Sequence, residues 1–184
     1  MILFWRRLDV AGLERLALDA GPDGVTATST VLGLDAGGYR LDYVWHLDPG
    51  WCTRQVSLVR TDAAGRRSIR LERAGDGWTV DGVPRADLDG ALEADLSATP
   101  FSNAMAIRRM PAGADLTLDV VYVDVGSMTA ARSRQRYLRR GRGRLRYVDL
   151  GLSAGFEADL DVDATGLVLR YGRLFVREQP VAEG

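Results

Sequence analysis

The sequence contains no lysine, and all 24 of its basic residues are arginine. Without lysine the chain cannot form a Schiff base with a substrate or supply the lysine of a phosphate-binding P-loop. Cys52 is the single cysteine, so no internal disulfide can form, and a chain of 184 residues buries enough surface to fold without one. His46 is the single histidine, which excludes zinc or iron sites built from several histidines.

Long apolar runs are also missing. None approaches the ~20 residues that a membrane-spanning helix needs, so we expect no stable membrane insertion. The sequence begins with apolar residues and places Arg6 and Arg7 after them, whereas a secretory signal peptide has its positive charge first. We therefore expect a cytoplasmic protein. The net charge of −1 gives no general attraction to nucleic acid, and no nucleic-acid partner is expected.

Turn-forming residues recur at short intervals, as in residues 21–24, 48–50 and 62–65. Between them lie segments of about eight to twelve residues that alternate apolar and polar side chains, a pattern typical of meandering antiparallel strands. The clearest alternation covers residues 39–47 and places on one face Tyr39, Leu41, Tyr43, Trp45 and Leu47. Such alternation predicts one buried and one solvated face.

Three further segments extend this pattern. Residues 154–162 alternate in the same way, with Phe156 on the apolar face. Residues 116–125 are apolar on both faces, which predicts a central strand covered on two sides. Residues 12–20 admit a short helix by composition, but they also fit a strand that pairs through the turn at 21–24, and we favour the strand.

The clearest helix signal covers residues 100–109. Thr99 is a suitable N-cap, because its hydroxyl can accept a hydrogen bond from a free N–H of the first turn. Pro100 would occupy the first helical position, where its missing N–H costs nothing. We predict a short helix here.

These segments together predict a mainly β protein with a single domain over residues 1–184. Because many strands need closure or cover for their edges, we expect an antiparallel sheet curled into an open barrel or β-roll, with one or two short covering helices. Strands precede and follow the helix, which is compatible with an internal duplication into halves of about 1–98 and 111–178. The identity between these halves is too weak to define a repeat.

Catalytic and metal-binding patterns are scarce. Any Ser-His-Asp or Cys-His arrangement must use His46, which the alternation places on the charged face of residues 39–47. The stripe Asp159-x-Asp161-x-Asp163 lacks the glycine and the glutamate that a calcium-binding loop requires at later positions. We predict no catalytic residue, no metal and no cofactor. The alternative is an enzyme of unrecognised type, whose cleft would be formed by Asp87, Asp89, Asp95 and Arg108.

Eight arginines crowd into residues 132–146. They could form a phosphate-binding stripe, and an arginine-rich interaction module for nucleic acid or protein is a further alternative function. They could instead pair with carboxylates of neighbouring strands, chiefly Glu157, Asp159, Asp161 and Asp163. The net charge near zero favours internal pairing, although the tip at Gly141-Arg142-Gly143 could still contact an anion.

Aromatic residues are spread over most of the predicted strands: Tyr39, Tyr43, Trp45, Trp51, Trp78, Tyr122, Tyr137, Tyr147, Phe156, Tyr171 and Phe175. Their rings either fill the interior of the curled sheet or enclose an apolar cavity, for which ~300–1,000 Å³ is typical of a ligand site. The spacing of the rings is compatible with both interpretations.

One stretch resembles a known family. The run Asp95 to Asn103, followed by Ile107-Arg108-Arg109-Met110, resembles the bacterial putative glycolipid-binding family. Further matching segments are, in chain order, Trp5, Tyr43 to Trp45, Trp51-x-Thr53-Arg54, Gln135-Arg136-Tyr137, and Asp163 to Val168 ahead of Tyr171. The family commonly has Leu-Pro before Ile-Arg-Arg. This chain has Met105-Ala106 there, so we expect its helix to be uninterrupted.

The resemblance implies a fold similar to bacterial lipoprotein carriers, an antiparallel sheet curled into an open barrel with helical cover. It implies a non-catalytic protein that binds a small amphiphile, a glycolipid or lipid-like molecule. It supplies no catalytic residues and leaves the oligomeric state open. The residues expected to contact the ligand are Tyr43, Trp45, Trp51, Phe101, Asn103, Met105, Ile107, Arg108, Arg109 and Tyr137.

Within this set we expect an apolar cavity with an arginine at its polar mouth. One end of the cavity would be closed by Phe101, Met105 and Ile107. Arg108 and Arg109 project about 100° apart on a helix and cannot face the same pocket. One of them would pair with Asp95, and the other would present its guanidinium group to a sugar, phosphate or carboxylate.

Overall fold

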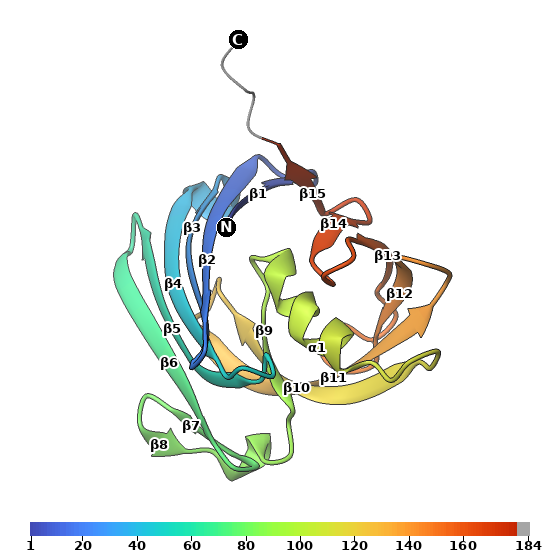
Figure 1. The fold of residues 1–184 in the computed structure, drawn as a ribbon. Coiled ribbons are helices and arrows are strands. Elements are labelled where there is room, and N and C mark those ends of the chain that lie inside the picture. Colours follow the sequence, from blue (N-terminus) through green and yellow to red (C-terminus); the bar gives the residue numbers. More distant parts are fainter. Residues whose placement is uncertain (180–184) are drawn as a thin grey trace.

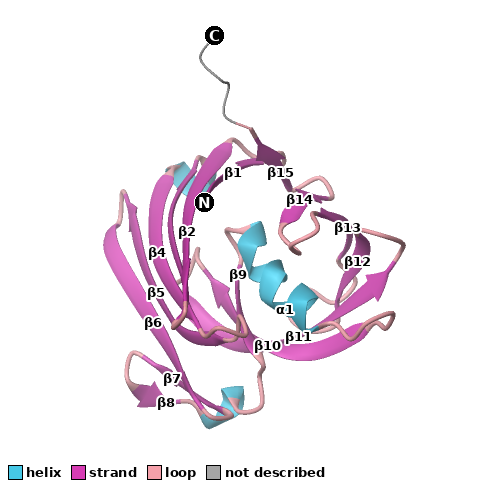
Figure 2. Cartoon of the chain, in the orientation of Figure 1, coloured by secondary structure: helices cyan, strands magenta, loops and turns pink. Residues whose placement is uncertain are grey.

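The computed structural model describes residues 1–179, and residues 180–184 of the predicted domain lie outside the described part. Fifteen strands form one sheet, which curls around a short helix without closing (Figure 1). Figure 2 shows the helix lying inside the curve of the strands. This confirms the predicted open, mainly β architecture. The strand order is β8-β7-β6-β5-β4-β3-β2-β1-β15-β14-β13-β12-β11-β10-β9.

The strands of the first half are β1 (Ile2–Arg7), β2 (Gly12–Gly21), β3 (Gly24–Gly33), β4 (Tyr39–Leu47), β5 (Thr53–Asp62), β6 (Gly65–Ala74), β7 (Gly77–Val80) and β8 (Val83–Pro84). Those of the second half are β9 (Glu93–Leu96), β10 (Leu116–Asp124), β11 (Thr129–Arg139), β12 (Arg144–Asp149), β13 (Glu157–Val162), β14 (Val168–Tyr171) and β15 (Phe175–Glu178). The helical elements are η1 (Asp35–Gly37), η2 (Ala86–Leu88), η3 (Pro100–Ser102) and α1 (Asn103–Arg109). The duplication into two halves stays a prediction.

The sequence patterns located the long strands well. In β4 the five predicted residues of the apolar face are buried, and the opposite positions are exposed or half-buried. Residues 12–20 form a strand and not a helix, since β2 pairs with β3 through Gly21 and Gly24. Gly24 has a φ of +136°, and a Cβ there would lie 2.1 Å from the carbonyl oxygen of Leu47, so the turn depends on glycine.

In strands β10 and β13 the pattern of apolar and polar residues predicts only part of the observed burial. Residues 116–125 were predicted to be covered on both faces, and in β10 the adjacent residues Val120 and Val121 are both buried. The apolar face of 154–162 is correct for Ala158 and Leu160, but β13 begins only at Glu157. Phe156 lies in the preceding loop and is 38% exposed, because the backbone turns at Gly155 with a φ of +96°.

The parallel pairing of β9 with β10 places the helix inside the sheet. All other strand pairs are antiparallel, but two parallel neighbours require a long crossover connection. Here that connection contains η3 and α1, which return over the concave face of the sheet (Figure 1). The crossover of this βαβ unit carries six of the ten residues predicted to contact the ligand: Phe101, Asn103, Met105, Ile107, Arg108 and Arg109.

Thr99 and Pro100 begin the helical segment as predicted. The hydroxyl of Thr99 accepts a 3.1 Å hydrogen bond from the amide of Phe101, and Pro100 follows the cap directly. The helix continues without interruption through Met105 and Ala106. Because the sheet surrounds it, α1 is buried on most sides and carries alanine and methionine on its inner positions.

The short helix η3, which precedes α1, packs against strand β4 of the first half. Phe101 has no exposed surface, and its ring meets that of Trp45 edge to face, with the centroids 5.7 Å apart. Tyr43 packs edge to face on the other side of Trp45 at 6.3 Å. These aromatic residues are therefore packed against one another as part of the core.

Candidate functional site

Two hollows lie at opposite ends of strands β12, β13 and β14, one near each end of the helical segment. The first, called the aromatic cavity below, has a volume of about 230 Å³. It is lined by Asp95, Leu96, Ser97, Thr99, Asn103, Tyr122, Tyr147, Asp149, Ser153, Phe156, Tyr171, Leu174 and Phe175. The second, called the arginine hollow, has a volume of about 610 Å³. It is lined by Ile107, Arg108, Arg139, Arg142, Gly143 and residues 162–166.

Four aromatic rings, three from β12, β14 and β15 and one from the loop before β13, form one wall of the aromatic cavity. The centroid of Tyr171 lies 5.8 Å from that of Tyr147, 6.4 Å from Phe156 and 6.3 Å from Phe175, and the rings are tilted or edge to face. Tyr147, Tyr171 and Phe175 are buried in the wall, whereas Phe156 stands at the rim. Phe156 is therefore the ring with the most surface available to a ligand.

Asp95 supplies a carboxylate to the same cavity. It is half-buried on β9 and accepts a 2.5 Å hydrogen bond from Nε2 of Gln135. Burial raises the pKa of Asp95, and the nearby charge of Asp149 raises it further, while hydrogen bonds from Gln135 and Ser102 oppose this shift. The carboxyl group is thereby inclined toward the neutral form.

Asp149 holds the rim of the aromatic cavity in place through three hydrogen bonds. One of its oxygens, Oδ1, accepts hydrogen bonds from the amides of Gly151 at 2.8 Å and Ser153 at 3.1 Å. The other, Oδ2, accepts one from the hydroxyl of Tyr147 at 3.2 Å. This carboxylate fixes the loop of residues 150–156 that carries Phe156.

Thr99 connects the cavity to a buried carboxylate that the sequence analysis did not select. Its hydroxyl donates a 2.6 Å hydrogen bond to Oε2 of Glu14, and Ser29 and Tyr43 donate to Oε1 at 2.7 and 2.6 Å. Glu14 is 1% exposed, and burial raises its pKa despite the three hydroxyl donors. This network ties the cavity wall to strands β2, β3 and β4.

The two neighbouring arginines of α1 have different surroundings, as the helix geometry predicted. The guanidinium carbon of Arg108 lies 3.6 Å from the ring centroid of Trp51 at the edge of the arginine hollow. Arg109 pairs with Glu93, the closest nitrogen and oxygen being 2.5 Å apart. The predicted pairing with Asp95 is therefore wrong. Because the helix folds back over β9, its last turn lies beside the start of that strand.

The predicted contact residues do not form one site. Tyr43, Trp45, Phe101, Met105 and Tyr137 are buried in the core. Of the others, Asn103 lines the aromatic cavity, Ile107 and Arg108 line the arginine hollow, and Arg109 borders a third depression near Cys52. The prediction of an apolar cavity with an arginine at its mouth is therefore wrong, because the helix separates the aromatic cavity from Arg108.

The cavity rings Tyr147, Phe156, Tyr171 and Phe175 belong to the aromatic set seen in the sequence, but no pattern distinguished them from core residues. The alternative carboxylate and arginine cleft is not assembled either. Asp95 and Arg108 lie in different hollows, and Asp87 pairs at the surface with Arg85 at 2.7 Å.

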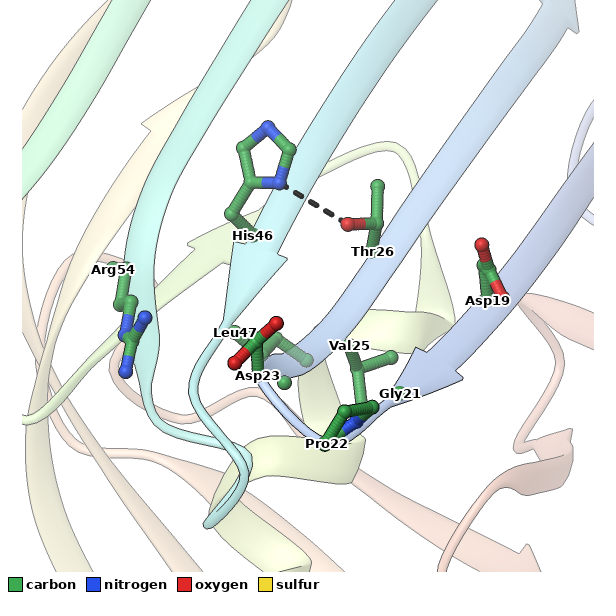
Figure 3. A pocket seen from close by; sticks show the side chains of 10 residues that line it. Asp19, Gly21, Pro22, Asp23, Val25, Thr26, His46, Leu47 and Arg54 are labelled. Carbon is green, nitrogen blue, oxygen red and sulfur yellow. Dashed lines mark hydrogen bonds between the residues drawn. The ribbon is translucent and has the colours of Figure 1, made fainter.

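His46 lies on the outer face, as predicted. Its Nδ1 lies 3.2 Å from the hydroxyl of Thr26, in a depression beside the turn of β2 and β3. Figure 3 shows this contact. Within residues 1–179 no hydrogen bond joins His46 to a carboxylate.

Among the same residues, no three potential metal ligands of the histidine, cysteine, aspartate or glutamate type gather in one place. None of the helices described is long and apolar enough to cross a bilayer.

Comparisons with known proteins agree with this architecture. A crystal structure of a DUF1089 family protein from Pseudomonas aeruginosa is similar, with a TM-score of 0.79 and 30% sequence identity over 91% of this chain and 92% of that chain. No match was found among the curated proteins. Residues 2–177 match the model of a family described as putative glycolipid-binding. With nearly its whole length matched, the chain belongs to the putative glycolipid-binding family.

Proposed function

We propose that the protein binds a small amphiphile, such as a glycolipid, without catalysing a reaction, and that the sugar enters the aromatic cavity. The observation that carries this proposal is the combination of four tilted aromatic rings and a half-buried carboxylate around one interior hollow. The family description points to the same class of ligand.

The size of the cavity determines which part of the ligand it holds. At about 230 Å³ it is smaller than the ~300–1,000 Å³ of a site that encloses a drug-sized ligand. It suits a compact head group, and the rest of the molecule would extend past the rim. That part of the ligand would contact the exposed apolar side chains of the rim loop, Leu150, Leu152 and Phe156.

The cavity groups match the chemistry of a sugar. The C–H faces of a sugar ring pack on aromatic faces, while its hydroxyl groups need polar partners. The hydroxyl of Tyr171 makes no hydrogen bond within the described chain, and Asp95 has an acceptor oxygen besides the one bound by Gln135. The rings would supply most of the affinity, and these groups the orientation.

A second candidate function rests on Asp95. A carboxylic acid with a raised pKa beside a second carboxylate is a feature of general acid catalysts, including those of glycosidases. The oxygens of Asp149 are already engaged by the rim loop and Tyr147, which favours a structural role for this second carboxylate. We therefore place binding ahead of hydrolysis.

Calorimetric titration with monomeric octyl glucoside tests the proposal. We expect the wild type to bind, and Phe156→Ala to weaken binding about tenfold through the loss of ~1.4 kcal/mol of apolar contact. Leu34→Ala, which removes an exposed apolar side chain on the opposite half of the sheet, should leave affinity unchanged. Native mass spectrometry of protein from cells should show a bound amphiphile.

The proposal fails if octyl glucoside does not bind and no amphiphile copurifies, or if both variants bind like the wild type. The same samples test the second candidate. Release of glucose that disappears in Asp95→Asn would identify a hydrolase and overturn the non-catalytic interpretation.

A further inference from the structure

The arginine hollow collects three guanidinium groups from separate segments. Arg108 comes from the last turn of α1, Arg139 from the end of β11 and Arg142 from the turn before β12. We infer that this hollow binds a phosphate group, free or as a phosphate ester. The site lies at the opposite end of the helical segment from the aromatic cavity, so it does not depend on the proposed function.

Arg108 is positioned but has no ionic partner. Its guanidinium carbon stacks 3.6 Å above Trp51, which orients the flat group and leaves the N–H donors along its edge available. Within residues 1–179 it makes no hydrogen bond and no ion pair. An oriented guanidinium with free donors suits the tetrahedral oxygens of phosphate.

Asp163 lines the same hollow, but its carboxylate is already engaged by other groups. Oδ2 of Asp163 lies 2.6 Å from Arg177, and Oδ1 accepts hydrogen bonds from the Thr165 amide, the Thr165 hydroxyl and the Leu167 amide. These contacts stabilise the turn between β13 and β14 and neutralise the charge of Asp163. The positive charge of Arg108 is therefore left for a ligand.

Arg139 and Arg142 add positive charge, and within residues 1–179 neither forms an ion pair with a carboxylate side chain. Arg139 donates through Nε to the carbonyl of Ala114 and through Nη2 to that of Pro111, both at 3.0 Å, so neutral groups hold it in place. Arg142 stands between two glycines and makes no ion pair in the described chain. The carbonyl groups that end α1 oppose an anion, but three full positive charges outweigh this partial one.

Some of the neighbouring arginines have carboxylate partners. The predicted pairing with neighbouring strands is confirmed for Arg144 with Asp161 and for Arg146 with Glu157 and Asp159. It is wrong for Asp163, which pairs with Arg177, and Arg132 and Arg136 pair instead with Asp119 and Asp115. Arg134 and Arg140 make no ion pair in the described chain either, but they lie outside the hollow. The hollow of about 610 Å³ brings three unpaired arginines together in one place. A compact anion fits this distribution better than an extended polyanion.

The test is a titration of ¹⁵N-labelled protein with inorganic phosphate at constant ionic strength, monitored through the arginine Nε–H signals. We expect the signals of Arg108, Arg139 and Arg142 to move in a saturable way. Arg108→Ala and Arg142→Ala should each weaken binding about tenfold, by ~1.4 kcal/mol, as expected for one charge-assisted contact. Arg134→Ala is the matched control, because it removes an exposed arginine outside the hollow.

Two further titrations, with a phospholipid and with a soluble phosphate ester, identify the source of the phosphate. Short-chain phosphatidic acid binding more tightly than glucose 6-phosphate would indicate a lipid head group, and the reverse order a soluble ester. The inference is overturned if phosphate leaves the three signals unmoved, or if Arg134→Ala weakens binding as much as Arg108→Ala. Octyl glucoside titrations of the same variants keep the two sites apart, since Arg108→Ala should bind it like the wild type.

Discussion

The hydroxyl of Tyr43 on β4 donates a 2.6 Å hydrogen bond to the carboxylate of Glu14 on β2, across the intervening strand β3. Ser29 on β3 and Thr99 before η3 complete the set of donors. One buried carboxylate thus joins three strands to the helical segment inside the sheet.

Removal of this carboxylate should be costly. In Glu14→Ala three buried hydroxyl groups lose their acceptor, and we expect the free energy of unfolding to fall by about 3 kcal/mol, measured by urea denaturation at pH 7. Glu14→Gln keeps the shape and one acceptor oxygen, and should lose clearly less. A loss below about 1 kcal/mol for Glu14→Ala would contradict the structural role of the network.

The pH dependence of stability should reveal the protonation of the same group. Burial raises the pKa of Glu14 in the folded protein above the unfolded value of 4.5, so between the two pKa values the folded state binds more protons. Its contribution to stability is therefore complete below pH 4.5 and is lost as the pH rises through the folded pKa. The difference in unfolding free energy, Glu14→Gln minus wild type, should increase from pH 4 to pH 7. A difference that stays constant would show that the pKa of Glu14 is not raised.

Arg109 is expected to stabilise the fold through its pairing with Glu93. The carboxylate is 1% exposed and also accepts hydrogen bonds from the amide and hydroxyl of Thr53 at 3.0 and 2.6 Å. Arg109→Ala leaves this buried charge uncompensated, which should lower the unfolding free energy by about 3 kcal/mol. Adding Glu93→Gln should recover part of the loss in urea denaturation.

Arg108→Ala is the neighbouring control for that experiment. It removes only the stacking on Trp51, worth about 0.5–1 kcal/mol at an exposed position. Equal losses for the two arginine variants would show that Glu93 does not depend on its partner.

Substitution of Phe101 should affect mainly the stability of the fold, whereas substitution of Phe156 should affect mainly ligand binding. Phe101 is fully buried between Trp45 and Trp51, and Phe101→Ala should cost about 3–5 kcal/mol in thermal or urea unfolding. Phe156 is 38% exposed at the cavity rim, and Phe156→Ala should cost less than about 1.5 kcal/mol while reducing amphiphile affinity. The reverse order of the two losses would contradict this assignment of core and rim.

The strands could be predicted because their signal is local. The two-residue alternation of β4 and the turn between β2 and β3 lie within short stretches of sequence, and both match the structure. The short strand β9 has no such signal, since Glu93 and Asp95 interrupt its apolar character. Its burial depends on a parallel partner that begins about twenty residues later.

The candidate site was harder to predict, since its contacts connect distant segments. Glu14 is buried on β2 together with Leu16, but the three donors to its carboxylate come from other parts of the chain. The divergence of Arg108 and Arg109 followed from helix geometry, whereas the identity of Glu93 as the partner depends on how the helix folds back. No local pattern shows that one group of aromatic rings packs solidly and another borders a cavity.

The pairing of β1 with β15 has a consequence for biosynthesis. These two strands lie side by side in the sheet although the aligned residues Trp5 and Arg177 are separated by most of the chain. A nascent chain that has emerged only as far as the helix has β1 as an unprotected edge, which can recruit a neighbouring copy on the same messenger. Slow translation of the second half should therefore promote aggregation, because β1 stays unpaired until β15 has been made.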